Sequence, residues 1–134
     1  MVTHFRELRV YREAFDGAMQ VFERSKRWPI DERYSLTDQI RRSSRSVCGQ
    51  IAEAWRKRCY VAHFRSKLSD ADSEAAETQS WLEFAHHCGY ISRDVFVALD
   101  TVYERVCGGL VNMMTHAEQW CSQKKIRSGP ESPD

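Results

Sequence analysis

One apolar pattern in the middle of the chain constrains the fold more than any other feature. Between residues 60 and 87, apolar or small residues recur at strictly alternating spacings of three and four, at Val61, Phe64, Leu68, Ala71, Ala75, Thr78, Leu82 and Ala85. A period of about 3.5 residues is typical of a helix that packs on other helices with left-handed coiled-coil geometry. The pattern therefore predicts one long helix over residues 60–87, which needs partner helices to cover its stripe.

Three further stretches carry helical patterns that can supply those partners. The apolar positions of residues 3–27 are Leu8, Tyr11, Phe15, Ala18 and Phe22. Those of residues 35–58 are Leu36, Ile40, Val47, Ile51, Ala54 and Trp55. Those of residues 92–121 are Phe96, Leu99, Val102, Val106, Leu110, Met113, Ala117 and Trp120.

These four stretches together predict the fold class. The chain has only 6 glycines and 3 prolines, so it has few places to turn, and this favours a few long helices. We expect an all-α protein, an up-and-down antiparallel four-helix bundle over residues 1–121. The pattern is lost after that, and we expect residues 122–134 to form a disordered tail.

Particular residues mark the predicted helix ends. The expected N-caps are Thr3, Ser35 and Ser92, whose hydroxyls can accept hydrogen bonds from N–H groups of the first turn. Gly89 is expected to end the helix over residues 60–87 in the left-handed conformation. An unbroken helix from 35 to 87 would rotate its two apolar stripes about 90° apart, so we expect a break near Arg58–Tyr60.

Two glycines lie inside the last helical pattern. Gly108 and Gly109 would each cost about 1 kcal/mol relative to alanine in a helix interior. They therefore predict either a kink or a close contact with another helix at this point.

Charge and composition indicate the cellular compartment of the protein and limit its partners. Its 20 basic and 19 acidic side chains give a formal net charge of +1, so no global field attracts nucleic acid or a membrane. No apolar run approaches the ~20 residues of a membrane span, and the N-terminus lacks the apolar core of a signal peptide. The 5 cysteines are widely spaced without a C-x-x-C pair. We expect a cytoplasmic protein with buried, reduced thiols.

The predicted helix over residues 35–58 also has a basic face. Its arginines are Arg41, Arg42, Arg45 and Arg56, and the small residues Gly49 and Ala52 lie in the same sector. Such a face is often solvated and joined by local ion pairs, for example between Asp38 and Arg42. Arg45 differs because no acid lies three or four residues from it, which makes it a candidate for contact with phosphate or with another chain. No aromatic residue is interleaved with this face, and this argues against stacking of single-stranded bases.

The sequence predicts neither catalysis nor a metal site. His86, His87 and Cys88 are consecutive, and consecutive helical residues point about 100° apart, so they cannot face one ion. No nucleophile is accompanied by a recognisable base, and Gly108-Gly109 is not followed by the Lys-Ser/Thr pair of a phosphate-binding loop. We expect a non-enzymatic protein without a cofactor.

Four blocks of the sequence, taken with their order and spacing, resemble the family of four-helix-bundle or 23S rRNA intervening-sequence proteins. The blocks are Phe5-Arg6-Glu7-Leu8-Arg9-Val10-Tyr11 with Ala14; Leu36-Thr37-Asp38-Gln39-Ile40-Arg41-Arg42-Ser43-Ser44-Arg45-Ser46-Val47; Ile51-Ala52-Glu53-Ala54-Trp55; and Glu77-Thr78-Gln79-Ser80-Trp81-Leu82 leading to Gly89-Tyr90-Ile91. The resemblance covers roughly residues 5–120.

This resemblance implies a four-helix bundle that assembles as a ring, a homopentamer in known members. It also implies similarity to the accessory protein of diversity-generating retroelements, which binds nucleic acid and a reverse transcriptase. Gln50 and Ala54 stand where the family pattern usually has Asn and Gly. Most members have no established activity.

Two functions are therefore open. In the first, Arg41, Arg42, Arg45 and Arg56 bind RNA or DNA, and their repetition around a homo-oligomer raises avidity. In the second, the same arginines pair with acids of a neighbouring subunit, and the protein is a scaffold that binds no nucleic acid. The candidate acids are Asp70, Asp72, Glu74 and Glu77. The resemblance favours the first function.

Overall fold

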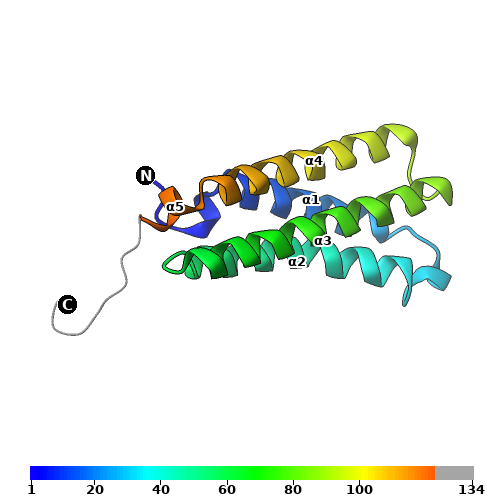
Figure 1. Cartoon of the computed structure of the whole chain (residues 1–134). Coiled ribbons are helices and arrows are strands. Elements are labelled where there is room, and N and C mark those ends of the chain that lie inside the picture. Colours follow the sequence, from blue (N-terminus) through cyan, green and yellow to red (C-terminus); the bar gives the residue numbers. More distant parts are fainter. Residues whose placement is uncertain (123–134) are drawn as a thin grey trace.

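The computed structural model describes residues 1–122, and every regular element in this range is helical. The long helices are α1 (Arg9–Ser25), α2 (Leu36–Arg56), α3 (Val61–His87) and α4 (Arg93–Thr115). Short helical segments are the 3₁₀ turns Phe5–Glu7 and Ile30–Glu32 and the helix α5 (Ala117–Cys121). Consecutive long helices run in opposite directions, and α1 closes the bundle by packing on α4 as well as on α2 (Figure 1). The predicted up-and-down four-helix bundle is confirmed, whereas the predicted tail, apart from Ser122, lies outside the described residues.

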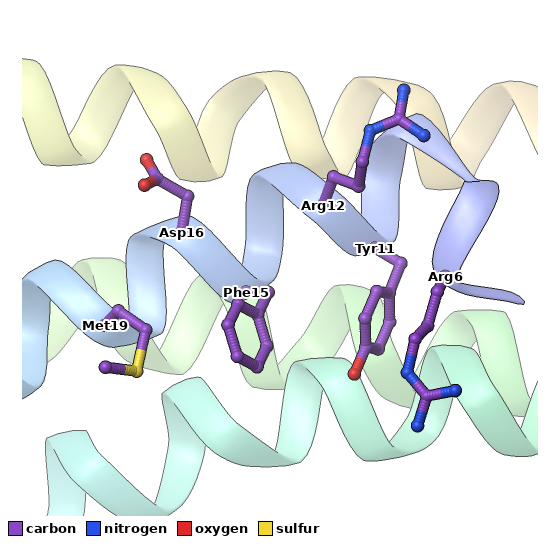
Figure 2. Close-up of a pocket in the computed structure, with 6 residues that line it drawn as sticks. All are labelled: Arg6, Tyr11, Arg12, Phe15, Asp16 and Met19. Carbon is purple, nitrogen blue, oxygen red and sulfur yellow. The ribbon is translucent and has the colours of Figure 1, made fainter.

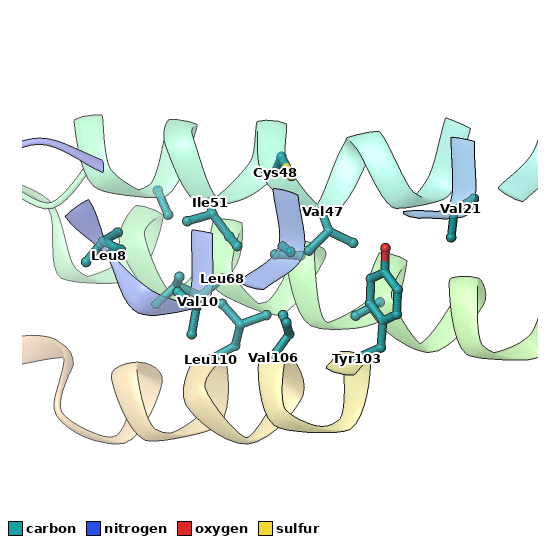
Figure 3. Packing of buried hydrophobic residues seen from close by; sticks show 14 of the residues in the cluster. Leu8, Val10, Val21, Val47, Cys48, Ile51, Leu68, Tyr103, Val106 and Leu110 are labelled. Carbon is teal, nitrogen blue, oxygen red and sulfur yellow. The ribbon is translucent and has the colours of Figure 1, made fainter. Parts of the chain in front are cut away.

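The stripe predicted for α3 forms the buried face of that helix. Seven of its residues are buried, namely Phe64, Leu68, Ala71, Ala75, Thr78, Leu82 and Ala85. Figure 3 shows side chains from all four long helices meeting in the core, among them Val10, Ile51, Leu68 and Leu110. The 3.5-residue period thus identified the core face of α3 correctly.

The predicted core face of α1 is wrong in part. The buried residues of this helix are Val10, Ala14, Gly17, Ala18, Val21 and Ser25. Phe15 is 50% exposed, while Tyr11 and Phe22 are only partly buried. Small residues face the core because α1 approaches α4 closely. A Cβ atom at Gly17 would lie 3.0 Å from the ring of Tyr103, so that ring occupies the space a larger side chain would need.

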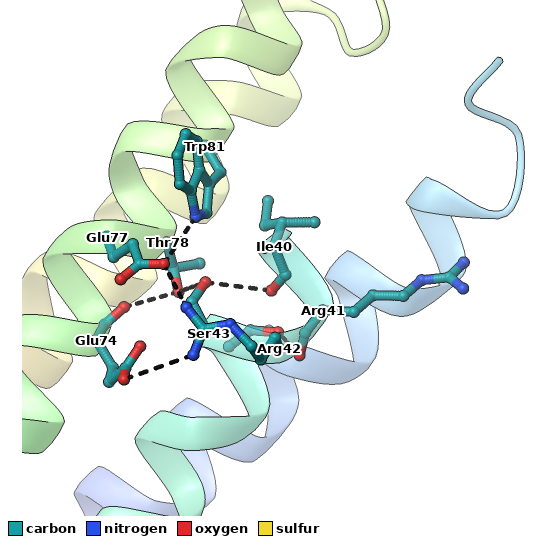
Figure 4. Close-up of polar contacts among 9 residues, drawn as sticks. Ile40, Arg41, Arg42, Ser43, Glu74, Glu77, Thr78 and Trp81 are labelled. Carbon is teal, nitrogen blue, oxygen red and sulfur yellow. Dashed lines mark hydrogen bonds and ion pairs between the residues drawn. The ribbon is translucent and has the colours of Figure 1, made fainter. Parts of the chain in front are cut away.

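Small side chains also bring α2 and α3 together. The hydroxyls of Ser43 and Thr78 are 2.8 Å apart, and both residues are fully buried (Figure 4). Each hydroxyl also has a carbonyl oxygen of its own helix within reach, that of Glu74 for Thr78 at 2.9 Å and that of Ile40 for Ser43 at 3.3 Å, so either hydroxyl can donate to the other. This contact shows that α2 and α3 approach each other closely at these two small side chains.

The N-terminal segment differs from the prediction. α1 begins at Arg9, and Thr3 lies before the 3₁₀ turn that precedes it. Thr3 is therefore not a helix cap; its own N–H donates to Glu7 Oε1 at 2.9 Å. The N-cap of the 3₁₀ turn is His4, whose Nδ1 accepts a hydrogen bond from the Arg6 N–H at 3.2 Å.

The start of α2 is capped by an acid that lies upstream of the predicted cap. The N–H of Leu36 donates to Glu32 Oε1 at 3.2 Å, and the Ser35 hydroxyl donates to the same oxygen at 3.0 Å. The other carboxylate oxygen of Glu32 accepts a hydrogen bond from the Tyr90 hydroxyl at 2.8 Å. These hydrogen bonds lower the pKa of Glu32, and the one from Tyr90 has the largest effect. Glu32 thus joins the α1–α2 connection to the α3–α4 connection.

The remaining helix ends follow the prediction until the end of α4. Gly89 has a φ of 82°, and the Ser92 hydroxyl accepts from the Val95 N–H at 3.2 Å. The expected break between α2 and α3 is present, because α2 ends at Arg56 and α3 begins at Val61. α4 stops at Thr115 instead of continuing to residue 121, and α5 follows as a separate short helix.

α4 continues through both of its glycines, and one of them makes a close helix contact. A Cβ atom at Gly109 would lie 2.4 Å from Val10 Cγ1 of α1, a distance that real Cβ atoms do not tolerate. Gly108, in contrast, has no neighbouring atom within 4 Å of that position. The glycine pair was predicted to mark either a kink or a close helix contact, and Gly109 makes the close contact.

Candidate nucleic-acid interface

Arg41 and Arg45 of α2 lie beside α1. The Arg41 guanidinium carbon is 4.9 Å from the centre of the Phe22 ring, and that of Arg45 is 5.6 Å from the same centre. Arg41 Nε also donates to the Ser25 hydroxyl at 2.8 Å. Neither arginine forms an ion pair with an acid within residues 1–122, so both charges are available to an anionic partner.

Arg42 lies on a different side of α2 from these two arginines. Its Nη2 is 2.7 Å from Glu77 Oε2, and its Nη1 is 3.9 Å from Glu74 Oε2 (Figure 4). Glu77 also accepts a hydrogen bond from Trp81 Nε1 at 3.2 Å. The expected local pair between Asp38 and Arg42 is therefore replaced by a contact across two helices.

The four acids proposed as intersubunit partners do not form one patch. Glu74 and Glu77 pair with Arg42 of their own chain. Asp72 contacts Cys107 on α4. The pKa of the Cys107 thiol is raised to about 12, mainly by burial and also by its hydrogen bond with Asp72. Asp70 is exposed on α3. The scaffold hypothesis requires exposed acids that are free to pair with a neighbouring subunit, and of the four only Asp70 is fully exposed.

The other predicted residues of α2 lie in different environments along the helix. Arg56 is exposed in its last turn. Ala54 is fully buried in the core. Gln50 is partly buried, and its Oε1 has no hydrogen-bond partner within the described residues. Gly49 is exposed, and a Cβ atom placed there would meet nothing within 4 Å, so the surface beyond Arg45 is open.

Aromatic residues that the sequence reasoning assigned to the core of α1 border this open surface. Tyr11 and Phe15 stack with ring centres 6.1 Å apart and an interplanar angle of 27°. They line a groove of about 380 Å³ together with Arg6, Arg12, Asp16 and Met19. Figure 2 shows Tyr11, Phe15 and Arg6 on the side of α1 that faces α2, whereas Arg12 and Asp16 point the other way.

Two further rings, Phe5 and Phe22, lie beyond Tyr11 and Phe15 along the chain, and each has a cation over it. Phe5 packs edge-to-face on Tyr11 with ring centres 5.0 Å apart, and the Arg6 guanidinium lies 4.9 Å from the centre of the Phe5 ring. Phe22 has Arg41 and Arg45 over it. We call this surface the α1–α2 face: Phe5, Arg6, Tyr11, Phe15, Met19, Phe22, Arg41, Arg45 and Gly49.

The α1–α2 face overturns one inference drawn from α2 alone. The basic face of α2 has no aromatic residue of its own, but α1 places the ring of Phe22 under Arg41 and Arg45 and turns Tyr11 and Phe15 to the side that faces α2 (Figure 2). A second stripe with three-and-four spacing, from Val10 through Ala14 and Gly17 to Val21, was the signal in the sequence that α1 could present its aromatic residues to solvent.

The described residues contain no group of side chains arranged as a metal site. Within residues 1–122, no three His, Cys, Asp or Glu side chains are grouped so that they could hold a metal ion. All five cysteines are free, and burial raises the pKa of Cys48, the thiol nearest to this face, to about 11. A thiol with that pKa is protonated near neutral pH and is a poor nucleophile. In the same range, no helix is long and apolar enough to cross a membrane.

Comparison with known proteins identifies the family. The family described as 23S rRNA-intervening sequence protein matches residues 6–112. The chain belongs to this family. The match includes α1, α2, α3 and all but the last residues of α4, so every residue of the α1–α2 face except Phe5 falls within the 23S rRNA-intervening sequence protein domain.

A solved structure agrees with this assignment. The chain is 25% identical to a protein of unknown function from the S23 ribosomal protein family of Bacteroides thetaiotaomicron, whose crystal structure superposes with a TM-score of 0.72. The similarity covers 79% of this chain and 95% of that protein. No match was found among curated proteins. The bundle is thus the fold that this chain shares with its structural relative.

Proposed function

We propose that this chain is a non-enzymatic, cytoplasmic RNA-binding accessory protein that holds the RNA backbone on its α1–α2 face. The observation that carries the proposal is the state of Arg41 and Arg45. Both guanidinium groups are held in place by α1, yet neither is neutralised by an acid of the described chain. Preorganised arginines without an acidic partner suit phosphate oxygens, to which their planar forks can donate two hydrogen bonds.

Assembly is part of this proposal. Two arginines on one bundle supply a modest electrostatic attraction, because the formal net charge of the chain is only +1. A homo-oligomer, for which we propose a pentameric ring, would present the same face several times to one RNA molecule. Simultaneous contacts of this kind raise avidity greatly without any new interaction in each copy.

The scaffold hypothesis is the weaker alternative. It assigns the arginines of α2 to acids of a neighbouring subunit, but Arg42 already pairs with Glu77 and Glu74 of its own chain. Glu74 and Glu77 contact α2, and Asp72 contacts α4. Among the proposed acids, Asp70 is the exposed one. An intersubunit pair between Arg45 and Asp70 is the form in which this hypothesis can still be tested.

The change Arg45→Glu tests the proposed function. If Arg45 contacts phosphate, the variant should bind RNA roughly tenfold more weakly, since a charge-assisted hydrogen bond contributes about 1.5 kcal/mol. The slope of log Kd against log salt concentration should also fall by about one. The measurement is a salt titration of RNA binding, with the assembly state followed by light scattering.

Arg93→Glu is the matched control, because it makes the same change in net charge at the exposed first residue of α4, where a carboxylate suits the helix dipole. We expect it to bind RNA like the wild type. Loss of the oligomer in Arg45→Glu would support the scaffold hypothesis instead. An intact oligomer with unchanged RNA affinity would remove Arg45 from both hypotheses.

A further inference from the structure

Phe15 and Tyr11 expose aromatic surface next to cations, and the proposed phosphate contacts do not use it. Phe15 is 50% exposed, and its ring stacks on that of Tyr11 at 6.1 Å. Met19, on the next turn of α1, is 45% exposed. Exposed aromatic rings within a basic groove are the arrangement on which unpaired bases stack in proteins that bind single-stranded nucleic acid.

We infer that the RNA on the α1–α2 face is single-stranded, with bases stacked on Phe15 and Tyr11 while its phosphates reach Arg41 and Arg45. This inference rests on the proposed function and adds the class of RNA that is bound. Phe15 and Phe22 are seven residues apart, which is about 10 Å along a helix axis. Three stacked nucleotides span about the same length at about 3.4 Å each, so one short strand can contact the rings and the arginines together.

The charges of the groove favour an anionic partner of this kind. Of its charged lining residues, Arg6 lies on the side that faces α2 with the two rings, whereas Arg12 and Asp16, which have opposite charges, point the other way (Figure 2). Asp16 accepts a hydrogen bond from Gln20 Nε2 at 2.7 Å. The groove therefore combines a positive balance with exposed rings, and an RNA single strand offers both phosphates and free base faces. In an RNA duplex the bases stack on one another and the strands present mainly phosphates and 2′-hydroxyls, which cannot use the rings.

The test compares Phe15→Leu with Phe84→Leu. Phe84 of α3 is a matched control, since it is also a helical phenylalanine and is 57% exposed. Each full-length variant is titrated with a fluorescent single-stranded RNA of about a dozen nucleotides and with the corresponding RNA duplex. We expect the wild type to prefer the single strand. Phe15→Leu should weaken single-strand binding about tenfold and leave duplex binding unchanged, whereas Phe84→Leu should alter neither.

Other outcomes separate this inference from the function on which it rests. If Phe15→Leu binds the single strand like the wild type while Arg45→Glu binds weakly, RNA binding stands and base stacking on Phe15 is overturned. If the wild type binds neither RNA, both proposals are overturned. If Phe15→Leu dissociates the oligomer without altering RNA affinity, a second copy of the chain covers Phe15, and the inference is again overturned. Circular dichroism melting of each variant checks that the fold is intact.

Discussion

Replacing Gly109 with leucine is expected to lower the free energy of unfolding by about 2 kcal/mol or more. The first atom of the new side chain would lie 2.4 Å from Val10 Cγ1, so α1 and α4 would have to separate. Valine is β-branched and has little rotational freedom with which to move away. Overpacking of this kind costs about 1–3 kcal/mol and sometimes more, which exceeds the ~1 kcal/mol that leucine gains over glycine in helix propensity.

Gly108→Leu is the matched control for this change. Gly108 lies in the same helix with no atom within 4 Å of the added Cβ, so leucine there should raise stability by about 0.5–1 kcal/mol. Urea unfolding, followed by circular dichroism at one protein concentration, measures both variants. Equal stabilities would show that α1 does not pack on α4 at Gly109.

Tyr103→Ala is expected to lower the free energy of unfolding by about 3–5 kcal/mol. Tyr103 is fully buried, and its ring lies against Gly17 of α1, where no side chain can move in to fill the cavity. Its hydroxyl is buried without a hydrogen-bond partner within residues 1–122, and burial raises its pKa. The ring, rather than the hydroxyl, therefore supplies the stabilisation.

Tyr103→Phe distinguishes these two parts of the side chain. Removal of a buried hydroxyl that makes no hydrogen bond should leave stability unchanged or raise it slightly, because the desolvated polar group is lost. Thermal and urea unfolding of the two variants give the comparison. A loss above about 1 kcal/mol in Tyr103→Phe would show that the hydroxyl does make a stabilising hydrogen bond, for which the Ser44 hydroxyl is the candidate partner.

The contrast between α3 and α1 shows how far the sequence could predict the fold. In α3 one apolar stripe has the helical period, so there was a single choice of core face. In α1 two stripes have that period, and the prediction took the one with Tyr11 and Phe15 as the core face. Close packing on Tyr103 instead selected the stripe with Ala14 and Gly17. That choice depends on the neighbouring helix and cannot be read from α1 alone.

The sequence could predict only those features of the candidate site that depend on residues close together in one helix. The absence of an acid near Arg45 is a property of α2, and Arg45 indeed has no ion pair within the described chain. The partner of Arg42 is Glu77, which lies 35 residues away in sequence, and spacing on one helix could not reveal it. The approach of Phe22 to Arg41 and Arg45 likewise requires the packing of α1 on α2.

The most direct test of the central claim, RNA binding on the α1–α2 face, is the RNA affinity of Gly49→Glu measured beside that of Gly108→Glu. Both glycines are exposed helical residues with open space around an added Cβ, so the fold should tolerate both changes equally. In Gly49→Glu the new carboxylate would lie one turn after Arg45, where it can pair with that arginine and repel phosphate. We predict that Gly49→Glu binds single-stranded RNA at least about tenfold more weakly than Gly108→Glu, with the same assembly state. Equal RNA affinities for the two variants would contradict the proposal.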